Sequence, residues 1–372
     1  MHIRRELKGQ IERALFKGKV IILYGARQVG KTTLVKEIIA NNSESRYLSC
    51  DEPDIRATFS HQTSTAMKAF IGSARLVVLD EAQRIEDIGI TLKLLHDTYP
   101  ELQIIATGSS SFELANKTVE PLTGRNLPFT LFPISYTEYA ETIGRTDAER
   151  LLEHRILYGM YPAVITAAAP AQEIKLISND YLFKDILRVE TVRKPIVVER
   201  LARLLALQIG SELSVNEIAQ RLEVSRPTVL SYIRLLEQAF VTFRLPPLGK
   251  NRRNEVTRFE KIYFYDTGVR NALIDDFKAL DARNDAGHLF ENFFIVERMK
   301  QRQRKGVDAK QYFWRTKDGS EVDYIEERGE ELAAFECKLS AGALRTRAWA
   351  NAFPGVPISL VTKTNISEML FA

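Results

Sequence analysis

The sequence contains a glycine-rich stretch whose residue types and spacing suit phosphate binding. Residues Gly25 to Thr32 read G-A-R-Q-V-G-K-T and fit the pattern G-x-x-x-x-G-K-[ST], between an apolar run and a helical pattern. Glycines let backbone N–H groups surround phosphates, Lys31 can reach the β and γ oxygens, and Thr32 can ligate Mg²⁺. We therefore expect Mg²⁺ at Thr32, and ATP or ADP to contact Gly25, Ala26, Arg27, Gln28, Val29, Gly30, Lys31, Thr32 and Thr33.

A second stretch places two carboxylates at the end of an apolar run. Leu76 to Glu81 reads L-V-V-L-D-E, the form expected of a Walker B motif. Asp80 is predicted to hold Mg²⁺ through water, and Glu81 to orient or deprotonate the attacking water. The second carboxylate favours hydrolysis of ATP over binding alone.

Two further polar positions are candidates for the same site. The segment Thr107 to Ser111 follows another apolar run, so Ser109 or Ser110 can act as a sensor of the γ-phosphate or as a helix N-cap. Arg125 can serve as an arginine finger toward a neighbouring subunit's nucleotide or lie in a solvated loop. A homo-oligomer is left open by these alternatives.

The elements that must position these residues alternate between short apolar runs and helical patterns up to about residue 135, which predicts a parallel sheet covered by helices. The expected strands are Val20 to Tyr24, Arg46 to Cys50, Leu76 to Asp80, Gln103 to Thr107 and Leu127 to Leu131.

A helix-turn-helix pattern follows a helical middle region. Helices are expected at Asn216 to Leu222 and Arg226 to Ala239, with Ser225 as N-cap, and a strand at Phe240 to Leu245. The polar positions assigned to the second helix are Arg226, Thr228, Ser231, Tyr232 and Arg234. DNA binding there would depend on the basic stretch 244–261, which includes Lys250, Arg252 and Arg253. A protein-protein interface and a lid over a nucleotide-binding domain are the alternatives.

The last third of the sequence contains a second group of candidate catalytic residues. Strands are expected at Ile262 to Asp266, Gln311 to Arg315, Glu321 to Ile325 and Leu332 to Lys338, with an amphipathic helix at Leu289 to Gln303. Glu291 lies on that helix, Asp323 on one strand, and Glu336 and Lys338 on the same face of the next. Carboxylates around one point with a lysine beside them suit metal-assisted phosphodiester hydrolysis, although the same residues can serve binding or packing instead.

These motifs together give a family resemblance over essentially the whole chain. They are GARQVGKTT at residues 25–33, LDEAQ at 79–83, TGSS at 107–110, PISYTE at 133–138, GMYP at 159–162 and KIYFYDTG at 261–268. The sequence resembles prokaryotic AAA+ type ATPases that carry a C-terminal domain of uncharacterised function. Ala26 stands where many members have proline, a change that leaves the phosphate contacts intact.

The resemblance implies an α/β protein with an AAA+ like P-loop NTPase domain, a helical and winged-helix middle, and a C-terminal domain similar to PD-(D/E)xK nucleases. The expected domains are a P-loop ATPase domain at residues 1–135, a helical region at 136–210, a winged helix-turn-helix at 211–250 and a nuclease-like domain at 251–372.

Composition excludes several other classes. The 372 residues are 45% hydrophobic and 27% charged, which excludes a disordered or fibrous chain. No apolar run can span a bilayer and residues 1–10 lack the apolar stretch of a signal peptide, so we expect a cytoplasmic protein with no membrane partner. Cys50 and Cys337, the only cysteines, indicate neither a disulfide framework nor a zinc site.

The sequence therefore predicts an ATPase that couples turnover to action on nucleic acid. Its rival is a nucleotide-dependent switch that changes how the C-terminal regions hold a protein partner. A DNA-binding regulator without nuclease activity lies between these two interpretations.

Overall fold

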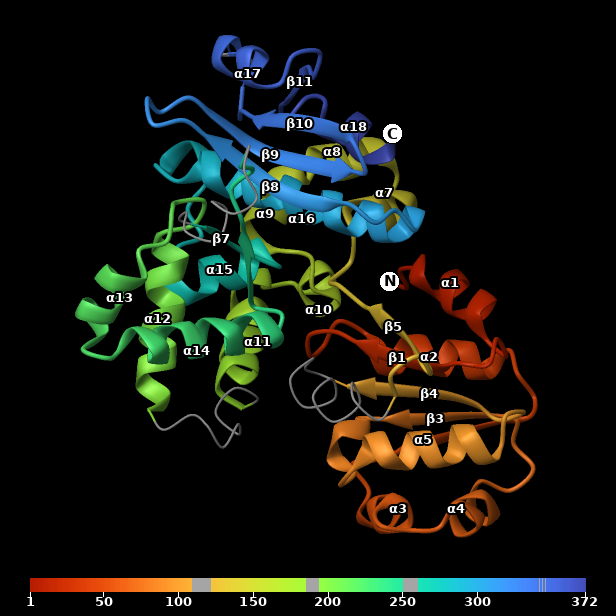
Figure 1. The fold of residues 1–372 in the computed structure, drawn as a ribbon. Helices are drawn as coiled ribbons and strands as arrows, with labels where there is room; N and C mark the ends of the chain where they lie inside the picture. The colour runs from red at the N-terminus through yellow and green to blue at the C-terminus, as the bar shows by residue number, and fades with distance from the viewer. Residues whose placement is uncertain (109–121, 185–193, 250–259, 341, 343, 345) are drawn as a thin grey trace. The chain divides into compact units, whose positions relative to one another are not determined.

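The computed structural model forms two compact units (Figure 1). One contains residues 4–133 and 238–240, and the other contains residues 1–3, 134–237 and 241–372. The structure describes residues 1–108, 122–184, 194–249, 260–340, 342, 344 and 346–372. We refer to the two as the N-terminal unit and the C-terminal unit.

The N-terminal unit is built on the five-stranded parallel sheet that the sequence predicts. Its strands are β1 (Val20–Tyr24), β2 (Ser45–Ser49), β3 (Leu76–Asp80), β4 (Gln103–Gly108) and β5 (Asn126–Thr130), each within one residue of the expected bounds. Their spatial order is β2-β3-β4-β1-β5. The strands β3 and β4 are buried at every position, which explains why they read as continuous apolar runs.

Helices pack on this sheet and supply the rest of the core, and α5 lies across one face of it in Figure 1. Their bounds are α1 (Leu7–Ala14), α2 (Lys31–Ala40), α3 (Pro53–Phe59), α4 (Ser64–Ile71) and α5 (Ile88–Thr98). Cys50 is buried in this core as a free thiol. Because the strands are parallel, their carboxyl ends meet at one edge, where the loops after β1 and β3 begin and where β4 ends.

The C-terminal unit begins with a helical layer. Its helices are α7 (Tyr136–Ile143), α8 (Arg145–Arg150), α9 (Leu152–Tyr158), α10 (Pro162–Thr166), α11 (Pro170–Lys184), α12 (Pro195–Leu207), α13 (Val215–Leu222), α14 (Arg226–Gln238) and α15 (Thr267–Ile274). The regions 136–210, 211–250 and 251–372, which the sequence separates, lie within this one compact unit except for residues 238–240.

The helix-turn-helix pattern corresponds to α13 and α14, followed by the antiparallel pair β6 (Thr242–Leu245) and β7 (Lys261–Phe264). Ser225 caps α14, since its hydroxyl accepts a hydrogen bond from the backbone N–H of Thr228 at 3.3 Å. The strand β6 begins two residues later than expected. Phe240 has a left-handed φ of 58°, so the extended backbone starts only after it.

A mixed four-stranded sheet completes the C-terminal unit. Its strands are β8 (Lys310–Arg315), β9 (Glu321–Arg328), β10 (Glu331–Cys337) and β11 (Ile358–Val361), in the spatial order β11-β10-β9-β8. The sequence analysis did not identify β11, which pairs parallel to β10. The helix α16 (Ala286–Lys305) contacts β10, and α17 (Arg347–Ala352) and α18 (Ile366–Phe371) lie near the C-terminus.

No helix in the described part of the chain is both long and apolar enough to cross a membrane.

Candidate active site

The glycine-rich loop connects β1 to α2 and has the backbone shape that phosphate binding requires. Gly30 has a φ of 98° and Gln28 a φ of 59°, so the loop turns back before α2 begins at Lys31. The ammonium of Lys31 is buried and donates to the carbonyl oxygens of Gly25 at 2.9 Å and Ala26 at 2.8 Å. It is therefore held at the loop by neutral carbonyls, which phosphate oxygens can replace as stronger acceptors.

The carboxylate of Asp80, at the end of β3, is held by hydroxyl groups from three different elements. Thr32 on α2 donates to it at 2.8 Å, Tyr47 on β2 donates at 2.6 Å, and Thr107 on β4 donates to its other oxygen. Burial and the nearby Asp80 charge raise the pKa of Tyr47, so its hydroxyl remains a donor. The sequence predicts that Thr32 and Asp80 share one site. It does not reveal Tyr47 and Thr107 as the side chains that orient Asp80.

Glu81 follows Asp80 in a left-handed conformation, with a φ of 57°. Its backbone N–H donates to the hydroxyl of Thr107 at 3.1 Å, and its carboxylate accepts from the amide of Gln83 at 2.6 Å. Thr107 thus fixes both acidic residues, and Gln83 orients the second. Gln83 was part of the LDEAQ motif but had no role assigned to it.

Of the other residues predicted for this site, the structure places Arg125. Ser109 and Ser110 fall outside the described residues. Arg125 lies at the opposite end of β1, because its carbonyl accepts from the backbone N–H of Val20 at 2.8 Å, and its guanidinium donates to Asp97 at 2.7 Å. That hydrogen bond lowers the pKa of the Asp97 carboxyl. Arg125 is therefore not at this chain's own glycine-rich loop, and a role toward a neighbouring subunit stays a prediction.

A second group of acidic residues gathers between α16 and the sheet of the C-terminal unit. The carboxylate of Asp323 accepts from the backbone N–H of Cys337 at 2.8 Å, and Lys338 donates to Glu336 at 2.7 Å. Burial, together with the charges of Glu291 and Glu336, raises the pKa of Asp323 well above its ordinary value. Asp323 is therefore affected by the charges of both Glu291 and Glu336, and Lys338 pairs with Glu336.

Lys261, which was expected in the basic stretch 244–261, is instead the internal cation of this acidic group. It is 2% exposed, lies 3.4 Å from Glu291, and also pairs with Glu321. Burial opposes its charge, but Glu291 and Glu321 outweigh burial and raise its pKa. Tyr263 also donates to Glu291. Lys261 and Tyr263 are two apart on β7 and share a face, which was the signal available in the sequence.

The remaining contact of Glu291 is with the imidazole of His288, at 3.3 Å. Glu291 thus has Lys261, Tyr263 and His288 as partners and is the most fully engaged carboxylate of the group. Within the described residues, no three His, Cys, Asp or Glu side chains are arranged to hold a metal ion on their own.

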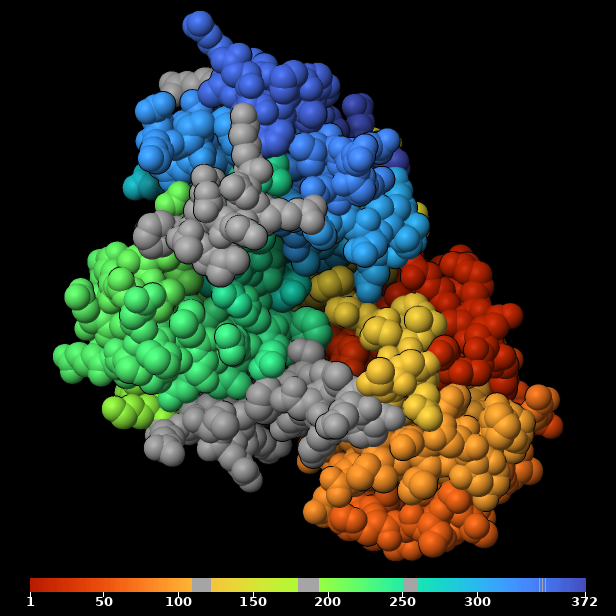
Figure 2. Space-filling model, in the orientation of Figure 1, coloured from red at the N-terminus to blue at the C-terminus, as the bar shows by residue number. Residues whose placement is uncertain are grey.

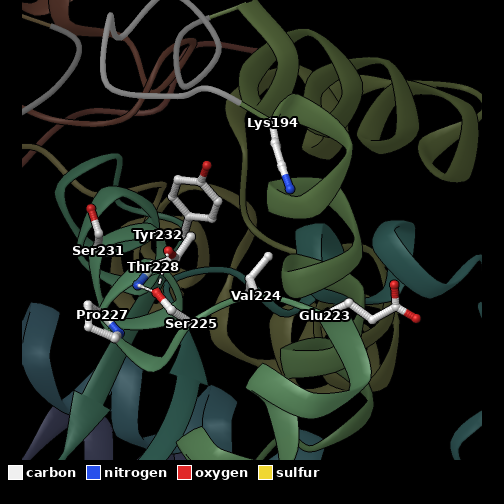
Figure 3. Close-up of a pocket in the computed structure, with 8 residues that line it drawn as sticks. All are labelled: Lys194, Glu223, Val224, Ser225, Pro227, Thr228, Ser231 and Tyr232. Carbon is white, nitrogen blue, oxygen red and sulfur yellow. Dashed lines mark hydrogen bonds between the residues drawn. The ribbon is translucent and has the colours of Figure 1, made fainter.

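The N-terminal half of α14 borders a cavity of about 590 Å³. Its lining includes Lys194 and the hydroxyl-bearing residues Ser225, Thr228, Ser231 and Tyr232 (Figure 3). Glu223 also belongs to the lining, and Figure 3 shows its carboxylate directed away from the Ser225 and Thr228 hydroxyls. The helices α13 and α14 occupy part of the green surface in Figure 2.

Two predictions about the helix-turn-helix surface need correction. Tyr232 is buried, because it lies three residues after Val229 and four before Leu236 on the packed face of α14. In the basic stretch 244–261, Arg244 pairs with Glu237 at 2.7 Å and Glu260 at 2.9 Å, and Lys261 is buried. Both cations are therefore paired with carboxylates of the protein itself. Lys250, Arg252 and Arg253 lie outside the described residues.

Comparison with known proteins assigns the N-terminal unit. Residues 17–140 match a family model described as an AAA domain. This unit is an AAA-type ATPase domain. Its five-stranded parallel sheet, glycine-rich loop and Asp80-Glu81 pair are the features that the sequence predicted for it. Residues 149–280 and 286–349 match two further models, each described as a domain of unknown function.

Relatives extend over most of the chain. An uncharacterized protein of Mycobacterium tuberculosis is 29% identical over 356 residues, which cover 94% of this chain and 77% of the relative. An uncharacterized protein of Methanocaldococcus jannaschii is 23% identical over 339 residues, covering 85% and 74%. Among solved structures, a Walker-type ATPase of Pyrococcus abyssi matches 73% of this chain and 96% of its own, with 14% identity and a TM-score of 0.49.

The position of Thr107 generates a prediction for this site. Thr107→Val leaves an oxygen of Asp80 and the N–H of Glu81 without a buried partner, so we expect the N-terminal unit to lose about 2 kcal/mol of unfolding free energy. We also expect MgATP binding to weaken about tenfold, because Asp80 and Glu81 are less well oriented. A loss of about 1.4 kcal/mol of binding free energy raises the dissociation constant tenfold. Scanning calorimetry and nucleotide titration measure the two effects. Thr98→Val, at an exposed position on α5, is the control, and equal effects in both variants would contradict the role of Thr107.

Proposed function

We propose that this protein hydrolyses ATP and uses the turnover to act on nucleic acid. The observation that carries the first part is the 2.8 Å hydrogen bond between Thr32 and Asp80, which joins the glycine-rich loop to the acidic end of β3. A hydroxyl and a carboxylate at this distance are oxygen donors of the kind Mg²⁺ prefers. Bound there, Mg²⁺ would neutralise charge on the phosphates.

The protein's own groups then have separate tasks. The N–H groups of the loop and the Lys31 ammonium bind the phosphates, the latter by leaving the carbonyls of Gly25 and Ala26. Glu81, oriented by Gln83, accepts a proton from the attacking water or holds that water in line. The side chains of Tyr47 and Thr107 keep Asp80 in place while this occurs.

Substitution of the two charged residues separates binding from hydrolysis. Lys31→Ala should weaken binding of a fluorescent ATP analogue by at least about 100-fold, because it removes the buried ammonium that faces the phosphates. Glu81→Gln should leave that affinity within about threefold and lower phosphate release about 100-fold or more. Lys93→Ala and Glu86→Gln, both at exposed positions, are the matched controls. Normal turnover in the Lys31 and Glu81 variants would contradict the assignment.

For the action on nucleic acid, we propose that α14 contacts DNA as part of a winged helix-turn-helix. Support comes from exposed Arg226, Ser231 and Arg234 on this helix and from the polar cavity at its N-terminal half. Since Arg244 and Lys261 are engaged internally, α14 itself has to provide the described cations.

The DNA contact is tested by removing the two exposed arginines of α14. Arg226→Ala combined with Arg234→Ala should weaken binding of duplex DNA and reduce the slope of affinity against salt by about two counterions. The control is Arg221→Ala on α13, whose guanidinium already pairs with Glu217 at 2.7 Å. Binding that is insensitive to salt would instead favour a protein partner for this surface.

A second candidate function is metal-dependent cleavage of a phosphodiester by a PD-(D/E)xK-like site in the C-terminal unit. The observation that favours it is that Glu336 keeps one buried oxygen without a partner, next to an Asp323 whose pKa its charge helps to raise. Asp323 and Glu336 would hold one divalent cation, as two carboxylates commonly do for Mg²⁺. Glu291 does not fit as a further ligand, because Lys261, Tyr263 and His288 occupy it.

Cleavage of plasmid and single-stranded DNA with Mg²⁺ or Mn²⁺, with and without ATP, tests this candidate. Lys338→Ala should lower the rate of cleavage about 100-fold or more. Mn²⁺ binding, measured by calorimetry, should persist in this variant. Asp323→Asn should lose both DNA cleavage and Mn²⁺ binding. Lys363→Ala, which removes an exposed pair with Glu153, should behave as the unsubstituted protein. The absence of both cleavage and Mn²⁺ binding would exclude this function.

A further inference from the structure

The segment 131–136 leaves the ATPase sheet after β5 and enters the C-terminal unit at α7, and it is fixed at both ends. At its start, the backbone N–H of Leu131 donates to the carbonyl of Tyr24 at 2.7 Å. A Cβ atom at Gly25 would lie only 2.4 Å from the carbonyl oxygen of Leu131. The segment therefore begins in direct contact with the first residue of the glycine-rich loop.

Arg5 forms hydrogen bonds both to the other end of the glycine-rich loop and to segment 131–136. Its guanidinium donates to the carbonyl of Val29 at 2.7 Å and to the carbonyl of Phe132 at 2.6 Å. Arg5 lies two residues before the start of α1, and it is 8% exposed. A planar guanidinium suits two acceptors in fixed positions, which a lysine cannot reproduce. A shift of the Val29 carbonyl therefore changes the contact that Arg5 makes with Phe132.

On the other side of Pro133, the segment is fixed to α16. The ammonium of Lys300 donates to the carbonyl of Ile134 at 3.0 Å, and the backbone N–H of Tyr136 donates to Glu297 at 2.6 Å. Glu297 and Lys300 pair with each other at 2.7 Å. They are 3% and 6% exposed, so these charged hydrogen bonds are shielded from water.

Only Pro133 separates the two sets of contacts, and its ring restricts φ. The helix to which the segment is fixed also carries Glu291, the carboxylate that holds Lys261. A displacement of segment 131–136 therefore acts on the contacts of Glu297 and Lys300, which lie on the same helix as Glu291.

We propose that Arg5 is a positioning residue that transmits the nucleotide state of the glycine-rich loop, through segment 131–136, to Glu297 and Lys300 on α16. This inference rests on the proposed use of ATP, and it names the regulation of that same site. Nucleotide binding moves the Val29 carbonyl, Arg5 moves with it, and the Phe132 carbonyl follows. The state of α16 then differs between the nucleotide-bound and nucleotide-free protein.

Hydrogen exchange of the full chain, with and without MgATP or a slowly hydrolysed analogue, measures this transmission. In the unsubstituted protein, ATP should change amide exchange in residues 131–136 and in α16 by about threefold or more. Arg5→Ala should still bind nucleotide, at most about tenfold more weakly, but lose the response of α16. Arg5→Lys should restore the charge without restoring the response. Arg13→Ala, exposed in the last turn of α1, is the control.

A second variant tests the receiving end without touching the nucleotide site. Glu297→Gln should keep nucleotide affinity within about threefold and also lose the ATP-dependent change in α16. A response of α16 that persists in Arg5→Ala and Glu297→Gln, with nucleotide bound, would overturn the inference. So would the absence of any response in the unsubstituted protein when nucleotide binds. Failure of the unsubstituted protein to bind nucleotide would contradict the proposed function itself.

Discussion

The proposed ATPase site depends on the placement of a single carboxylate. Asp80 receives hydroxyl donors from α2, β2 and β4, which are far apart in the sequence. These contacts are possible because β4 lies between β1 and β3, so Thr107 on it stands between the glycine-rich loop and the end of β3. A change of strand order would separate Thr32 from Asp80 even if every local motif remained. The tertiary arrangement of the sheet is therefore the condition for the chemistry of the site.

Local patterns predicted much of this unit but, apart from placing Thr32 and Asp80 at one site, not its long-range contacts. The glycine-rich loop, the Asp80-Glu81 pair and the strand bounds follow from residue types at fixed spacing. Tyr47 and Thr107 lie on strands where any polar residue would fit the pattern, and only strand pairing brings them to Asp80. Arg125 precedes a strand in the sequence, but the sequence does not reveal which end of the sheet it occupies. The structure places it at the start of β1, away from the glycine-rich loop.

The C-terminal unit was harder to predict for the same reason. The residues Glu291, Asp323, Glu336 and Lys338 were identified from their order and face, yet Lys261 was read as part of a basic surface stretch. Its partners Glu291 and Glu321 come from another helix and another strand, and a sequence pattern of charge alone does not distinguish a buried ion pair from a surface cation. Similarly, the basic appearance of residues 244–261 included Arg244, which two glutamates already neutralise.

The presence of Lys261 also bears on how this protein matures. In a cluster of carboxylates without a counter-charge, the negative charges repel one another. Folding of such a cluster is coupled to the binding of a metal ion. Here the compensating charge is part of the polypeptide and arrives with the strand β7. The charges of Glu291 and Glu321 are thus compensated by a side chain of the same polypeptide.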